Sequence, residues 1–258
     1  MKVITLNVNG LRSAARKGFY TWLRRQEADV VCLQELKAQE KELEARLFHP
    51  GRYHGCFHCA ERKGYCGVAI YTRAKPLEVV CGFGWKDVDA DGRYVEARFH
   101  GLSIVSVYVY SGSAGPERQA VKFGFLDRFM PYLESLRRRR REYIICGDWN
   151  IAHRQIDIRN WRSNQKNSGF LPEERAWMDR LFGPVGFVDA FRVVNQEPDQ
   201  YTWWSNRGRA WEKNVGWRID YQVVTPEIAR RVRAASIYKR KRFSDHAPLT
   251  IEYDYELR

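Results

Sequence analysis

The sequence predicts a single α/β domain, residues 1–258, in which two β-sheets pack face to face with helices outside. Short apolar runs of strand length alternate with amphipathic helical patterns along all 258 residues. Apolar residues make up 44% of the chain, which is enough for a large core. No linker, low-complexity segment or break in composition divides the sequence.

The first half of the chain is predicted to be rich in strands. In order, the pattern gives a strand at 2–6, a helix around 19–23, a strand at 29–33, a helix at 37–48, a strand at 67–71, and adjacent strands at 93–99 and 102–110. Pro50 and Gly51 end the second helix, and a loop rich in His, Cys and Gly follows it.

The second half opens with a long amphipathic helix that starts at Pro116. Its apolar residues Val121, Phe125, Phe129 and Leu133 recur at every fourth position. The later elements are a strand at 143–146, a long polar loop at 152–170, a helix from Pro172, strands at 201–204, 217–224 and 249–253, and a short helix at 226–232. A loop of this length inside a compact domain is usually functional.

Charge and composition indicate a polyanionic partner. The net charge is +13, and the chain holds 9 Trp and 14 Tyr. Basic residues interleaved with aromatic ones suit nucleic acid, although a soluble basic protein with an aromatic core remains an alternative. No uncharged apolar run reaches the roughly 18 residues of a membrane span, and no signal peptide is evident. A cytoplasmic location is expected, associated with the nucleoid if the source is bacterial.

The six cysteines are expected to be reduced, because most lie within apolar strand patterns. Cys56 and Cys59 have the spacing of half a zinc site, with Cys66, His54 and His58 nearby. A structural zinc site usually has a second, similarly spaced pair, and the sequence has none. Packing and loop roles are therefore favoured over zinc.

Polar residues gather where the apolar strands begin or end. They are Asn7, Glu35, Tyr108, Asp148, Asn150, Asp220, Asp245 and His246. Removing so many polar and acidic side chains from water would cost free energy without compensation unless they converge on an ion. Carboxylates and amides suit Mg²⁺ or Mn²⁺ better than zinc. The simpler alternatives are that Asp148 and Asn150 shape a turn and that His246 is a surface histidine.

Five motifs resemble the exonuclease III family of Mg²⁺-dependent apurinic/apyrimidinic (abasic-site) endonucleases. They are LNVNGLR at 6–12, LQELK at 33–37, GDWNIA at 147–152, GWRID at 216–220 and SDHAP at 244–248, and FLPEER at 170–175 also matches. The motifs follow the family order over nearly the whole chain, and five in order are highly specific. The resemblance implies a four-layer α/β sandwich, the DNase I-like fold. It also implies hydrolysis of the phosphodiester on the 5′ side of an abasic site.

The resemblance also implies a role for each site residue. Glu35 is the expected principal Mg²⁺ ligand, with Asn7, Asp148, Asn150, Asp245 and His246 completing the metal set and Mn²⁺ as a substitute. Asp148 is expected to activate water, and Asn150 to hold that water. Tyr108 and His246 would contact the scissile phosphate, and Asp220 would orient His246. Trp203, Trp217 and Ile219 would line a pocket for a flipped-out abasic sugar.

Two departures from the family pattern stand near the site. Asn9 lies where some relatives carry Asp, and Tyr110 with Ser111 lie where many have Pro followed by Asn or Gln. The second departure removes an amide from the phosphate-contacting loop. The expected partner is double-stranded DNA with abasic sites or 3′ ends, bound by a monomer.

Three rival functions remain open from the sequence. An enzyme of the same fold could act mainly as a 3′-5′ exonuclease or 3′-phosphodiesterase with little abasic-site incision. A lipid or inositol phosphoesterase is disfavoured by the +13 charge. A non-catalytic DNA-binding protein is disfavoured because every catalytic position that can be matched is filled.

Overall fold

The computed structural model describes residues 1–257, which form two six-stranded mixed sheets. The first sheet runs β13 (Val232–Ile237), β14 (Leu249–Tyr253), β1 (Lys2–Asn7), β2 (Val30–Gln34), β4 (Val68–Thr72), β3 (His54–His58). The second runs β5 (Glu78–Cys81), β6 (Tyr94–Arg98), β7 (Leu102–Tyr108), β8 (Glu142–Asp148), β12 (Asp220–Val224), β9 (Val188–Asp189). A separate ribbon pairs β10 (Trp203–Trp204) with β11 (Gly216–Trp217).

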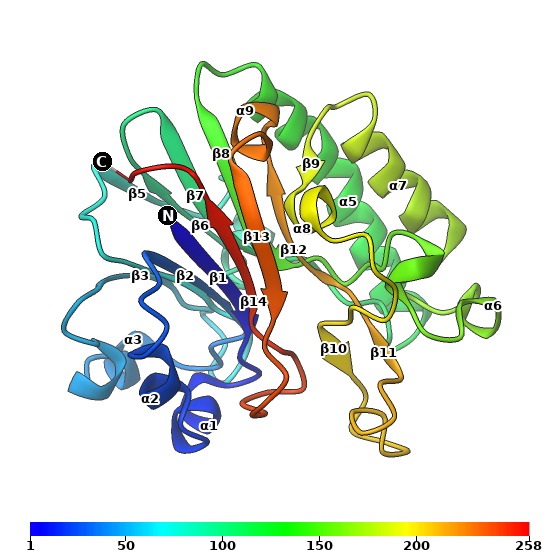
Figure 1. Ribbon diagram of the computed structural model, residues 1–258, viewed down its shortest axis with the longest axis horizontal. Helices are drawn as coiled ribbons and strands as arrows, with labels where there is room; N and C mark the ends of the chain where they lie inside the picture. Colours follow the sequence, from blue (N-terminus) through cyan, green and yellow to red (C-terminus); the bar gives the residue numbers. More distant parts are fainter. Residues whose placement is uncertain (258) are drawn as a thin grey trace.

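The helical elements lie outside the strands (Figure 1). They are α1 (Leu11–Arg16), α2 (Phe19–Leu23), α3 (Glu40–Leu43), η1 (Arg46–Phe48), α4 (Lys86–Asp89), α5 (Pro116–Arg137), η2 (Gln155–Asp157), α6 (Trp161–Asn164), α7 (Pro172–Phe182), α8 (Ala190–Val194) and α9 (Pro226–Ala229). None of the helices in residues 1–257 has the length and apolar character needed to cross a membrane.

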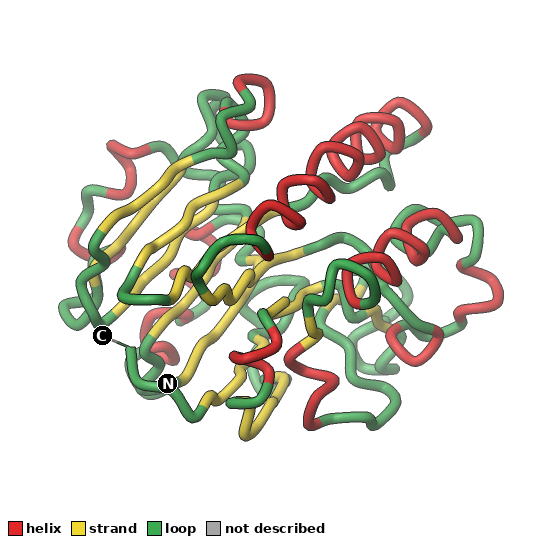
Figure 2. The backbone as a smooth tube through the Cα atoms, turned by 90° about the horizontal axis from the view of Figure 1, so that it is seen from above, coloured by secondary structure: helices red, strands yellow, loops and turns green. Residues whose placement is uncertain are grey.

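Three apolar cores separate four layers. Between the sheets, residues such as Val3 and Cys32 of the first sheet pack against Ile104 and Ile144 of the second. A second core joins the outer face of the first sheet to α1 and α2, and a third joins the outer face of the second sheet to α5 and α7. Figure 2 shows the strands running through the middle with helices at the periphery. The predicted four-layer sandwich of two mixed sheets flanked by helices is confirmed.

Several predicted elements differ in detail. The helix expected at 37–48 is two short pieces, α3 and η1, because Ala45 between them is extended, with φ −60° and ψ 135°. The strand expected at 201–204 is reduced to β10. The strand expected at 217–224 is divided, because β11 ends at Trp217 and β12 begins at Asp220. The edge strands β3, β5 and β13 were not predicted. These strands contain many exposed or polar residues. Their sequences therefore lack the regular alternation of apolar and polar residues that identifies a half-buried strand.

The long helix α5 was predicted with its apolar stripe partly misplaced. Val121 is 45% exposed, whereas the buried stripe contains Lys122, Phe125, Leu126 and Phe129. These four residues follow the i, i+3, i+4, i+7 spacing of one helix face. A lysine thus occupies a core position of this helix.

Candidate active site

The candidate site lies where the layer between the two sheets reaches one edge of the sandwich. Successive side chains of a strand point to opposite faces, so residues two apart share a face. Val3 in β1, Ile104 in β7 and Ile144 in β8 face the opposite sheet. The same alternation places Asn7, Tyr108 and Asp148 on that inner face, at the end of each strand.

Strand pairing brings these ends together from both sheets. β7 and β8 are parallel and pair Tyr108 with Asp148, while antiparallel β12 pairs Asp220 with Asp148. Asn7 ends β1 in the other sheet, and its Nδ2 donates to Asp148 Oδ2 at 2.9 Å. The β10–β11 ribbon projects past this edge (Figure 1). One hydrogen bond between Asn7 and Asp148 therefore joins the two sheets inside the site.

His246 lies between two buried carboxylates. Its Nδ1 is 2.9 Å from Asp220 Oδ2, and its Nε2 is 3.8 Å from Asp148 Oδ2. The side chains of Asp148, Asp220 and His246 are almost completely buried. The alternative of a surface histidine is thus wrong.

The electrostatics of this trio follow from burial and charge. Burial raises the pKa of Asp148 to about 7, although the neighbouring His246 opposes that shift. Burial alone would lower the pKa of His246, but Asp220 and Asp148 raise it to about 10. The imidazole is therefore a cation near neutral pH, while Asp148 can exchange a proton there.

Glu35 joins the site through the same asparagine. Asn7 Nδ2 donates to Glu35 Oε1 at 2.7 Å, and Lys37 Nζ lies 2.7 Å from Glu35 Oε2. Burial opposes ionisation of Glu35, yet Lys37 and Asn7 outweigh it and hold the pKa of this carboxyl below its ordinary value. Glu35 has a φ of 53°, in the left-handed region, which turns the chain sharply after β2.

Asp245 forms the other rim of the site. Its Oδ1 accepts from Asn9 Nδ2 at 2.9 Å, and its Oδ2 accepts from Trp203 Nε1 at 3.2 Å. Burial opposes its ionisation, but the adjacent His246 and these donors lower its pKa. Asn9 also accepts from Lys37 at 2.6 Å. The amide at position 9 therefore links the loops that carry Glu35 and Asp245.

The donor set fits a hard divalent cation. Asp148, Asp220 and His246 each offer a ligand atom within 4.8 Å of the others, and they are the one such group of three in the described chain. Asp220 Oδ1 is buried, and no partner for it exists within residues 1–257. Asn7 adds a buried amide oxygen, and Glu35 and Asp245 add carboxylate oxygens. These residues could hold a metal ion, with carboxylate and amide oxygens as its ligands.

Asn150 and Tyr108 flank Asp148. The Asn150 backbone N–H donates to Asp148 Oδ1 at 2.9 Å, and its Nδ2 donates to the Val109 carbonyl at 2.9 Å. Asn150 has a φ of 52°, as expected for a tight turn. The turn interpretation of Asp148 and Asn150 is thus correct in part, because the turn itself belongs to the site. Burial raises the pKa of Tyr108, so its phenol stays protonated.

A cavity of about 500 Å³ opens beside these residues. Its lining includes Tyr108, Asn150, His246 and the three expected pocket residues Trp203, Trp217 and Ile219. The two indole rings meet edge to face, with centroids 6.1 Å apart and planes at 87°. Trp203 also forms a β-bridge with His246. The cavity wall and the carboxylate–imidazole cluster are thus directly connected.

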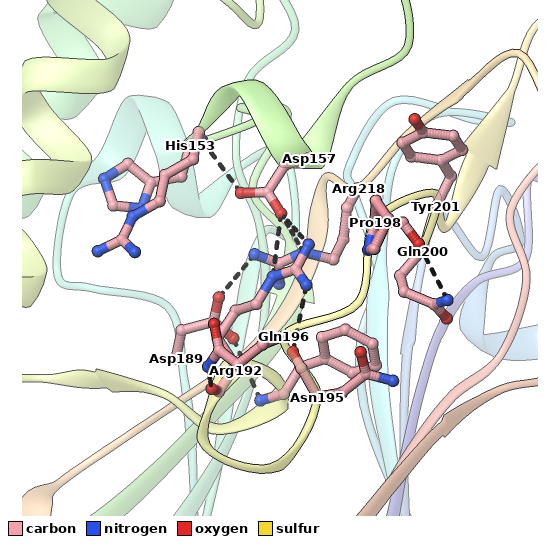
Figure 3. Close-up of polar contacts among 12 residues, drawn as sticks. His153, Asp157, Asp189, Arg192, Asn195, Gln196, Pro198, Gln200, Tyr201 and Arg218 are labelled. Carbon is pink, nitrogen blue, oxygen red and sulfur yellow. Dashed lines mark hydrogen bonds and ion pairs between the residues drawn. The ribbon is translucent and has the colours of Figure 1, made fainter.

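A buried ion network holds the strand that carries this wall (Figure 3). Arg218 lies between Trp217 and Ile219 in sequence, and its side chain is fully buried. It contacts Asp157 at 2.8 Å and Asp189 at 2.7 Å, while Arg192 also contacts Asp157 at 2.7 Å. These pairs hold the pKa of Asp157 near 2 against the effect of burial. The network fixes the backbone from which both pocket side chains project.

The structure thus brings together all eight polar residues and all three pocket residues singled out from the sequence. The contacts of Lys37 with Glu35 and Asn9 were not predicted, and neither was the pair Lys122 and Glu174 behind Asn150. Two signals were available: Lys122 lies on the apolar stripe of α5, and Glu174 lies in the FLPEER segment at 170–175.

The fold and this carboxylate–imidazole cluster are those of a nuclease-type hydrolase. The chain belongs to the endonuclease/exonuclease/phosphatase family, whose model matches residues 4–246. An exodeoxyribonuclease of Bacillus subtilis is 37% identical over 253 residues, covering 97% of this chain and 98% of that protein. The DNA repair nuclease APEX1 of Danio rerio is 36% identical over 256 residues, covering 97% of this chain and 81% of that protein.

Solved structures give the same result. An AP endonuclease from Archaeoglobus fulgidus has a TM-score of 0.90 at 29% identity, covering 99% of this chain and all of its own. A 3′-5′ exonuclease from Neisseria meningitidis has a TM-score of 0.89 at 27% identity, again covering 99% of this chain. These comparisons confirm the resemblance to exonuclease III and the abasic-site endonucleases.

Proposed function

We propose that this chain is a Mg²⁺-dependent DNA repair phosphodiesterase that cleaves the backbone on the 5′ side of abasic sites. The same site would also remove nucleotides or blocking groups from 3′ ends. One observation carries the proposal: an aromatic cavity opens directly on a buried carboxylate–imidazole cluster, and Trp203 belongs to both. An abasic site would fit this arrangement, with its exposed sugar in the aromatic cavity and its neighbouring phosphate at the carboxylate–imidazole cluster.

The metal would be held mainly by Glu35, with Asn7, Asp148 and Asp245 close by. Asn150 and His246 would complete the ligand set, and His246 offers a ligand atom close to those of Asp148 and Asp220. In its charged form His246 would instead contact the scissile phosphate. When bound, Mg²⁺ would neutralise the phosphate and stabilise the leaving oxygen, and Mn²⁺ would substitute for it.

The proton transfer is assigned to Asp148. Its pKa of about 7 places it where a carboxylate can take a proton from water and later return one to the leaving oxygen. Asn150 would hold that water, because its backbone already bonds Asp148. His246, oriented by Asp220, and the neutral phenol of Tyr108 would donate to the phosphate oxygens, whose charge grows in the transition state.

The cavity would select the lesion by shape. An abasic sugar lacks a base, so it could turn out of the helix and pack against Trp203, Trp217 and Ile219. The net charge of +13 would attract the phosphate backbone of double-stranded DNA. We propose that the protein acts as a monomer in the cytoplasm, with the open face of the site against the duplex.

A second function has an observation of its own. Two neighbours from Neisseria, with TM-scores of 0.89, are named as a 3′-5′ exonuclease and as a 3′ phosphatase bound to a product DNA hairpin. A site of the same fold can therefore act on 3′ ends. An enzyme that mainly trims or cleans 3′ ends, with little abasic-site incision, is the alternative.

One experiment separates the two functions. The substrate is a duplex with one stable abasic analogue, incubated with Mg²⁺ and, in parallel, with EDTA. Incision at the lesion only when Mg²⁺ is present supports abasic-site cleavage. Stepwise shortening from the 3′ end, with the lesion uncut, supports the alternative, and equal cleavage in EDTA would refute the metal requirement.

A further inference from the structure

A buried ion pair lies directly behind the candidate site. Lys122 in α5 and Glu174 in α7 are both fully buried, and the Lys122 Nζ is 2.5 Å from Glu174 Oε1. Burial lowers the pKa of Lys122, while Glu174 and the nearby Asp148 oppose that shift. A buried pair of this kind often contributes little net stability, since both ions must leave water. Its position within the fold is therefore informative.

Each member of the pair also bonds backbone that lines the cavity. Lys122 Nζ donates to the carbonyl of Asn150 at 2.7 Å. Glu174 Oε2 accepts from the backbone N–H of Gly169 at 2.6 Å and from that of Leu171 at 3.0 Å. Asn150 and Gly169 both line the cavity. The pair therefore connects the segment after Asp148 with the neighbouring loop of the cavity lining.

The space around Gly169 leaves little room for adjustment. The glycine has a φ of 91°, and a Cβ there would lie 3.0 Å from the Asn150 carbonyl oxygen and 3.1 Å from the Trp217 ring. The carbonyl of Gly169 accepts from the Ala152 N–H at 2.8 Å. A small movement of this loop would thus be transmitted both to Asn150 and to the aromatic wall.

We propose that Lys122 and Glu174 are a positioning pair that fixes the spacing between Asn150 and the cavity loop, and thereby aligns the abasic sugar with Asp148. This inference rests on the proposed function, and it names two residues that do not touch substrate. Lys122 suits the task because an ammonium group has several donors and can bond a carbonyl and a carboxylate together. Glu174 suits it because its second oxygen is free to accept from the loop.

The test compares four variants of the full chain: Lys122→Met, Glu174→Gln, the double variant, and Glu96→Gln. Each single change at the pair leaves one buried group without its charged partner, so its thermal midpoint should fall. The neutral double variant should recover much of that midpoint. Glu96 is the matched control, because it is fully buried and paired with Arg98 at 2.9 Å, but it does not line the cavity.

In the double variant we expect stability to recover while the rate of incision stays low, because the loop is still not held in place. For the double variant, kcat for abasic-site incision should stay about 10- to 100-fold below wild type with KM little changed, because a displacement of about 1 Å can have an effect of that size. Deuterium exchange of the segment 166–171 should also be faster. Glu96→Gln should change neither readout, even if it unfolds at a lower temperature.

A double variant with wild-type kcat and wild-type exchange in the 166–171 segment would overturn the inference. If the wild type itself fails to cut in Mg²⁺, the proposed function is wrong. The exchange measurement would then still decide whether the pair anchors the loop.

Discussion

The Nδ1 atom of His246 lies 2.9 Å from Asp220 Oδ2, and almost no solvent reaches either side chain. With Asp148 nearby, this contact raises the pKa of His246 from 6.5 to about 10. A group with a raised pKa binds its proton more tightly in the folded state. Its contribution to stability is full below pH 6.5 and is lost as the pH rises from 6.5 toward 10.

Metal-free protein should therefore lose stability between pH 7 and 9. The slope contributed by His246 can reach about 1.4 kcal/mol per pH unit. Urea unfolding in EDTA across this range measures it. The His246→Gln variant should show a clearly flatter profile, and equal slopes in the two proteins would contradict the assignment of a charged imidazole.

Replacing Asp148 by Asn should abolish proton transfer with only a local change in the site. The amide oxygen can still accept from the Asn150 N–H, but the amide loses the acceptor for Asn7 Nδ2 and cannot take a proton from water. The rate of incision should fall by at least about 100-fold, while affinity for abasic DNA survives. Asp87→Asn at an exposed ion pair with Arg128 is the control. Equal loss of binding and turnover would mean that Asp148 is structural.

Glu35→Gln should weaken metal binding more than folding. A ligand that binds only the folded state raises the unfolding midpoint, so Mg²⁺ should stabilise the wild type in thermal melts. The variant should lose most of that increase while melting close to wild type in EDTA. Glu42→Gln removes a carboxylate paired with Arg12 and should keep the full Mg²⁺ effect. A normal Mg²⁺ response in Glu35→Gln would place the metal elsewhere.

Trp217→Ala should reduce selection of the lesion. The indole forms a wall of the cavity and meets Trp203 edge to face. The kcat/KM for abasic-site incision should fall about 10- to 100-fold, the effect expected for lost apolar contact, with a smaller effect on trimming of undamaged 3′ ends. The matched control is Trp211→Ala, since Trp211 packs on Trp204 away from the cavity. Equal losses on both substrates would argue against a lesion pocket.

Asp157→Asn should destabilise the whole chain. Asp157 compensates the buried guanidinium of Arg218 and also contacts Arg192 (Figure 3). Leaving a buried arginine without this partner should cost about 3 kcal/mol, or roughly 10 °C in the unfolding midpoint. Asp199→Asn breaks an exposed pair with Arg159 and should change stability by less than about 1 kcal/mol. Similar midpoints for both variants would contradict a structural role for the network.

The clustering of polar side chains at one edge of the sandwich was foreseeable because it depends on strand ends. Val3, Ile104 and Ile144 follow period two, so the residue types at positions 7, 108 and 148 can be assigned to the same inner face before any coordinates exist. Glu35 and Asp245 were expected to converge with these strand ends as well, but the role of each residue came only from the family resemblance.

The elements that could not be predicted are those governed by tertiary contacts. The exposed residues of β13 fold as a strand only because β14 offers a pairing edge. Lys122 lies on the apolar stripe of α5, but only the fold brings its partner Glu174, 52 positions away, beside it. A buried charge is identifiable only together with its partner, and sequence spacing does not give that partner.

The bond between Asn7 and Asp148 crosses from one sheet to the other. Under the proposed function, catalysis would therefore require the two sheets to be docked, in addition to each sheet being folded. A molecule in which the two sheets had moved apart could keep all the backbone hydrogen bonds within each sheet. It would still be inactive, because the polar residues of the site would be divided between the two separated sheets.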